Sequence, residues 1–148
     1  MRPWLGLCVA IAIVASCKKR DRGDDEAARA MALGALADIK QAIATAKTRL
    51  GTPDGPQGMA RCASVASIRL DLRETPYHQL ATELEQLCDV ELPATELAAA
   101  VALLDDDPAR CAAFPLEPQI ALLEKSRPSP ETQALVERYR KHCPTARD

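Results

Sequence analysis

Cysteines are the residues of this chain whose type and spacing could support chemistry of their own, and there are six of them. Four of the six, Cys62, Cys88, Cys111 and Cys143, lie in the body of the sequence, each more than 20 residues from the next. A structural zinc site usually uses pairs of cysteines only about two to four residues apart, so this spacing argues against zinc. An even number of cysteines in an exported domain instead predicts two disulfides.

The N-terminal stretch has the layout of a secretory signal peptide. Arg2 supplies a positive charge, residues 5–14 are apolar, and the small residues Ala15 and Ser16 follow. The apolar run is too short to span a bilayer stably. We therefore expect the chain to be exported to a compartment where thiols oxidise. Cys8 would leave with the signal as part of its apolar run.

The end of this signal resembles the lipobox of bacterial lipoproteins, in which an aliphatic residue and two small residues precede a cysteine. The matching residues are Val14, Ala15, Ser16 and Cys17. The resemblance covers residues 1–17 only. It implies removal of residues 1–16, lipidation of the Cys17 thiol and attachment to the membrane through that lipid. Because Lys18 replaces the Asp that would retain such a protein at the inner membrane, we expect the outer membrane, facing the periplasm. The alternative is an ordinary cleaved signal.

Composition narrows the function of the mature chain. Removal of residues 1–16 leaves 132 residues, enough for one domain, or two small ones, with a real core. The 18 remaining basic residues face 21 acidic ones, and this acidic balance argues against a nucleic-acid partner. Only Tyr77, Phe114 and Tyr139 remain as aromatic residues, which disfavours sites for sugars or bases.

Histidines and a run of aspartates are the candidate metal ligands. His78 and His142 are the only histidines, and neither has a second histidine or an acid four residues later. We expect both to be surface residues. Residues 105–107 are three aspartates without the alternating spacing of an EF-hand loop, so we interpret them as a linker with a helix cap. The sequence predicts no metal site.

Carboxylate pairs are the remaining candidates for catalysis. Glu83 and Glu85, like Asp89 and Glu91, lie two residues apart, so their side chains should diverge on a helix. The chain has no nucleophile elbow, phosphate loop or dinucleotide fingerprint. We predict no catalytic residue and no cofactor.

Helical periodicity predicts an all-α fold. After a polar tether over residues 17–26, a helix is expected over residues 27–50, with acidic residues at its start and basic residues at its end. Its apolar residues recur at steps of three and four, which predicts a stripe that faces the core or, as an alternative, a coiled-coil partner. The stripe consists of Ala32, Leu36, Ile39, Ile43, Ala46 and Leu50.

Further helices are expected, and no stretch has the period-two alternation of a strand. Residues 52–58 have the composition of a loop, and residues 59–73 follow as a helix. Later helices are expected to start at a hydroxyl or acidic cap or at a proline. These starting residues are Thr75, Thr95, Asp107, Pro118 and Ser129.

An internal repeat selects the disulfide pairing. The sequence Ala-Arg-Cys-Ala occurs at residues 60–63 and 109–112, and each copy precedes a hydroxyl–proline pair and a second cysteine. We interpret residues 27–90 and 94–144 as two copies of a three-helix unit. If the chain reverses near Thr75 and near Arg127, each copy forms an antiparallel hairpin whose cysteines meet at its open end. The predicted disulfides are Cys62–Cys88 and Cys111–Cys143.

These observations favour a small helical bundle, or two stacked three-helix units, over residues 27–148. We expect a lipid-anchored envelope protein whose non-enzymatic domain binds another envelope protein or serves a structural role. One alternative is a lipoprotein that binds a small apolar ligand between the two units. A further alternative is an enzyme, which would need a cleft with converging acids or a histidine–acid pair.

Overall fold

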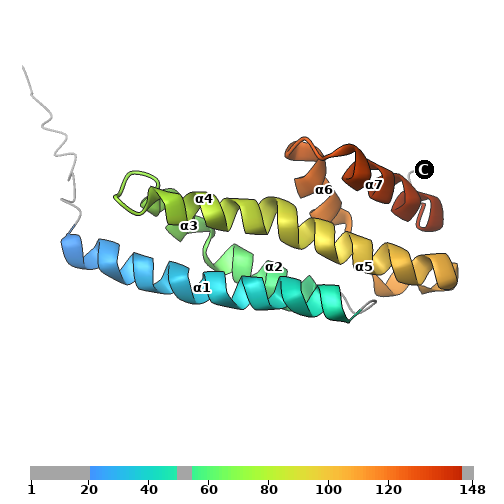
Figure 1. The fold of residues 1–148 in the computed structure, drawn as a ribbon, viewed down its shortest axis with the longest axis horizontal. Helices are drawn as coiled ribbons and strands as arrows, with labels where there is room; N and C mark the ends of the chain where they lie inside the picture. Colours follow the sequence, from blue (N-terminus) through green and yellow to red (C-terminus); the bar gives the residue numbers. More distant parts are fainter. Residues whose placement is uncertain (1–20, 50–54, 145–148) are drawn as a thin grey trace, which may run out of the picture.

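The computed structural model describes residues 21–49 and 55–144, and this part of the chain is all-α, as predicted, without a strand (Figure 1). In chain order the elements are α1 (Arg22–Thr48), α2 (Gly55–Ser64), α3 (Ala66–Leu72), α4 (His78–Gln86), the π-helical turn η1 (Leu87–Glu91), α5 (Leu92–Asp106), the 3₁₀ helix η2 (Pro108–Ala113), α6 (Glu117–Lys125) and α7 (Pro130–His142).

Helix α1 begins earlier than the sequence predicted. Residues 22–26, expected in the tether, form its first turns, with Asp24 and Asp25 placed where the helix dipole favours acids. The hydroxyl of Tyr77, which precedes α4, donates a hydrogen bond to Glu26. The Arg29 guanidinium lies 5.3 Å from the centre of the Tyr77 ring. These contacts with another part of the chain explain why a strongly polar stretch is helical.

The apolar stripe of α1 faces the core rather than a coiled-coil partner. The predicted positions from Ala32 to Ala46 are buried, while Leu50 lies outside the described residues. The stripe packs against α2, α3, α4 and α5, which surround α1 on one side (Figure 1).

The predicted loop at residues 52–58 is shorter than expected, because α2 already begins at Gly55. A Cβ atom at Gly58 would lie 2.9 Å from Leu92 Cδ2, so glycine allows α2 to pack closely on α5. The helix expected over residues 59–73 is interrupted at Val65, whose φ of −107° lies outside the helical range. The expected apolar side, Cys62, Val65, Ile68 and Leu72, is buried or half-buried in both halves.

A continuous helix replaces two helices that were predicted separately. The prediction that Thr95 caps a new helix is wrong: α4 continues through η1 into α5, and the Thr95 hydroxyl donates to the Glu91 carbonyl. The signal was misleading because Pro93 resembles a helix start. The wider π turn places the Leu92 N–H on the Leu87 carbonyl directly before this proline, which relieves the crowding that a proline causes in a regular helix.

Helix starts elsewhere follow the predicted caps more closely. Asp107 accepts a hydrogen bond from the Ala109 N–H at the start of η2, and Ser129 accepts one from the Thr132 N–H at the start of α7. Thr75 differs, since α4 starts only at His78: its hydroxyl donates to the Leu72 carbonyl of the preceding turn and accepts from the Tyr77 N–H. The reversal expected near Arg127 occurs there, with a left-handed φ of 57°.

Two apolar clusters form the core. The first extends from Ala32 to Leu92 and joins α1–α4 to η1, and the second extends from Leu97 to Cys143 and joins α5 to α6 and α7. Each cluster contains a disulfide. The order of helices in residues 27–90 is similar to that in residues 94–144. The proposed repeat boundary at residues 90–94 nevertheless lies inside the continuous α4–η1–α5 helix. The internal repeat therefore stays a prediction.

Candidate interaction surface

Both predicted disulfides are present. Cys62 in α2 is bonded to Cys88 in η1, and Cys111 in η2 is bonded to Cys143 after α7, with Cα–Cα distances of 5.6 and 5.5 Å. The pairing deduced from the hairpins is confirmed. The predicted lipidation residue Cys17 lies outside the described residues.

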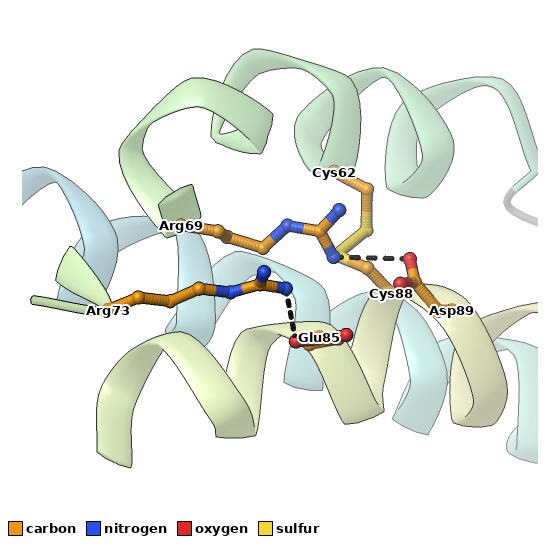
Figure 2. Close-up of polar contacts among 6 residues, drawn as sticks. All are labelled: Cys62, Arg69, Arg73, Glu85, Cys88 and Asp89. Carbon is orange, nitrogen blue, oxygen red and sulfur yellow. Dashed lines mark hydrogen bonds and ion pairs between the residues drawn. A yellow bond between two sulfur atoms is a disulfide. The ribbon is translucent and has the colours of Figure 1, made fainter. Parts of the chain in front are cut away.

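Two ion pairs continue the line of the first disulfide (Figure 2). Arg69 in α3 contacts Asp89 in η1 at 3.1 Å, and Arg73 contacts Glu85 in α4 at 2.9 Å. The pairs run in opposite directions along the two segments, as expected for antiparallel helices. The Arg69–Asp89 pair is partly buried, whereas the Arg73–Glu85 pair is exposed. Together with the disulfide, these contacts hold α2 and α3 against the α4–η1 helix.

A groove with a volume of about 520 Å³ lies between α1 and the α4–η1 helix. Lys40 of α1 contacts Glu83 of α4 at 2.6 Å across it, and Glu91 lies farther along its wall. Two glutamines, a threonine and two aliphatic side chains complete the lining: Gln79, Gln86, Thr82, Ile43 and Leu87.

A second groove, of about 470 Å³, lies on the other side of the same helix, against α6. The carboxylates of Glu85 and Asp89 line one wall, and Lys125 lines the other. Thr82 and Gln86 line both grooves and therefore form the ridge between them. This ridge and its two grooves are called the α4 ridge below; their lining combines charged and amide groups with the apolar side chains of Ile43, Leu87, Val90 and Leu122.

A histidine–acid pair occurs at the far end of α5. The His142 Nε2 atom lies 2.8 Å from Asp105 Oδ1, while Arg138 pairs with the other carboxylate oxygen. The hydrogen bond from His142, followed by the charge of Arg138, lowers the pKa of Asp105. The pair joins α7 to α5 and lies outside both grooves of the α4 ridge. His78 is exposed, as predicted, whereas His142 is half-buried. Its pair with Asp105 is a histidine–acid pair of the kind that the enzyme alternative requires, but it lies outside both grooves.

A buried polar pair was missed by sequence reasoning. Glu96 of α5 is fully buried, and its Oε2 atom accepts a 3.0 Å hydrogen bond from the Gln119 amide of α6. No signal marked Glu96, because it occupies an ordinary-looking position in an Ala- and Leu-rich helix. The pair lies on the stretch of α5 where the two apolar clusters meet, and it fixes the position of α6 on α5.

Comparisons with known proteins give no relative. No protein-family model, curated protein or solved structure matches this chain. Within residues 21–49 and 55–144, no cluster of three histidine, cysteine or acidic residues could hold a metal ion. In the same part of the chain, no helix is long and apolar enough to cross a membrane. The geometry of the described side chains is therefore the basis for a functional assignment.

Proposed function

We propose that this chain is an envelope lipoprotein, anchored through Cys17, whose non-enzymatic helical domain binds another envelope protein through the α4 ridge. One observation supports the proposal that the α4 ridge is a binding surface. The carboxylates Glu83, Glu85 and Asp89, which line the ridge, are each held by a basic side chain from a neighbouring helix. Acids held in this way join α4 and η1 to the neighbouring helices and so fix the shape of the ridge.

The α4 ridge suits a protein partner for a physical reason. The disulfide and two ion pairs hold its helix against α2 and α3, so we expect little conformational entropy to be lost on binding. Its exposed face offers amide, hydroxyl and carboxylate groups, including Gln86, Thr82 and Glu91. Such groups form the polar hydrogen bonds of a non-obligate interface.

Site-specific photocrosslinking in intact cells tests the partner. A photoreactive amino acid replaces Gln86 on the ridge or, as a matched control, the exposed Gln133 on α7. We expect a discrete crosslinked protein from position 86 only, and we expect Glu85→Lys to reduce its yield. Failure of position 86 to crosslink, or equal products from both positions, would contradict binding through the ridge.

The anchor is tested separately with Cys17→Ala. We expect this variant to keep its full precursor length and to carry no lipid. Cleavage at an unchanged position would show that the N-terminus is an ordinary signal peptide.

A further inference from the structure

The position of the anchor relative to α1 restricts how the domain can lie on a membrane. This step rests on the lipidation proposed above. Only four residues separate Cys17 from Arg22, the first residue of α1. An extended chain of that length reaches about 17 Å, whereas α1 itself is about 40 Å long. The lipid must therefore enter the bilayer close to the start of α1.

The start of α1 contacts the turn between α3 and α4. Tyr77 in that turn donates its hydroxyl proton to Glu26, and its ring contacts the guanidinium of Arg29. Figure 1 shows the start of α1 and this turn at the same end of the molecule, opposite the end of α5. We call this end of the molecule the anchor end. It consists of Arg22 to Leu33, the end of α3 and the turn that follows α3.

The anchor end also carries exposed apolar side chains. Among the described residues, the large apolar side chains that stay exposed are Met31, Leu33 and Leu70, with exposed fractions of 60%, 42% and 61%. Two of them are in the first half of α1, and Leu70 lies close to the end of α3. Single exposed apolar residues are common on protein surfaces, but Met31 and Leu70 both occur in the part of the molecule that the anchor brings to the membrane. Leu33 lies two residues from Met31 on α1, so its side chain diverges from that of Met31.

We propose that the anchor end rests on the lipid bilayer, with Leu70 and Met31 in the headgroup region, and that the end of α5 points away from it. Apolar contact and the covalent lipid hold this orientation. Lys18, Lys19, Arg20 and Arg22 directly follow Cys17 and would favour anionic headgroups, whereas Asp24, Asp25 and Glu26 would not. A bilayer of zwitterionic lipid therefore tests the apolar contact by itself.

Tryptophan fluorescence tests the orientation, because Trp4 is the only tryptophan and would be lost with the signal. Two variants of the lipidated protein, Leu70→Trp and Met31→Trp, place a tryptophan at the anchor end. Two control variants place it elsewhere: Ala44→Trp on the exposed far half of α1 and Ala102→Trp on the exposed far part of α5. Each variant is placed in phosphatidylcholine vesicles with or without brominated acyl chains. Bromine quenches tryptophan only at short range.

We expect quenching at positions 70 and 31 to be several-fold stronger than at positions 44 and 102. Equal quenching at position 44 would show a domain that lies on its side, and weak quenching at all four positions would show a domain that stands clear of the lipid. Either result would overturn the proposed orientation. The mass of the N-terminal peptide distinguishes the two proposals: an unlipidated Cys17 contradicts both, whereas a lipidated Cys17 without quenching contradicts the orientation alone.

Discussion

The hydroxyl of Tyr139 donates a 2.7 Å hydrogen bond to the carbonyl of Phe114 and accepts one of 3.3 Å from the Leu116 N–H. One side chain of α7 thus satisfies two backbone groups in the segment before α6. All three residues are buried, so water does not replace these bonds. The second half of the domain depends on this connection, because the segment from residue 114 to 116 has no regular helix.

Tyr139→Phe should lower the free energy of unfolding by about 1 kcal/mol, since it removes both hydrogen bonds of the hydroxyl, while the Leu116 N–H keeps its 2.9 Å bond to the Phe114 carbonyl. Tyr77→Phe is the matched control, because it removes a hydroxyl whose bond to Glu26 is exposed. We expect urea unfolding to show a smaller loss for the control. Equal losses would mean that the Tyr139 hydroxyl has no special structural role.

The two disulfides should contribute similarly to stability. They close loops of similar length, with sequence separations of 26 and 32 residues, and loop-entropy arguments give about 3–4 kcal/mol for each. Cys62→Ala with Cys88→Ala, and Cys111→Ala with Cys143→Ala, should therefore lower the urea midpoint to a similar extent. A variant pair that unfolds at the wild-type midpoint would show that its disulfide adds nothing to the folded state.

The Asp105 ion pairs predict a loss of stability in acid. The hydrogen bond from His142, together with Arg138, lowers the pKa of Asp105 in the folded protein. A depressed pKa of this kind stabilises the fold above the unfolded value, about 3.9, and this contribution is lost as the pH falls through the folded value. Melting temperatures of wild type and Asp105→Asn should therefore converge below about pH 4. Asp106→Asn is the control, and a constant difference for Asp105→Asn across the acid range would contradict the prediction.

The sequence predicted the features that depend on local spacing. Helical periodicity identified the buried stripe of α1, and the symmetric positions of cysteines around Thr75 and Arg127 identified both disulfides. Hairpin geometry makes such pairings predictable, because antiparallel helices bring residues at equal distances from a turn together. The caps at Asp107 and Ser129 were predictable for the same local reason.

Features that depend on tertiary contacts could not be predicted. The π turn before Pro93 has no local signature, so the continuous α4–η1–α5 helix resembled two helices. Contacts such as Glu96 with Gln119 and Asp105 with His142 join residues 23 and 37 positions apart on separate helices. Their sequence neighbours do not determine these partners. The α4 ridge depends on the same long-range packing.

The covalent state of Cys17 is the most direct test of the account, because both the envelope location and the orientation on the membrane depend on it. Mass spectrometry of the protein purified from membranes would identify the N-terminal peptide. We predict a chain that begins at Cys17 and carries a diacylglyceryl group. A mature chain with an unmodified Cys17, or a chain that retains residues 1–16, would contradict the account.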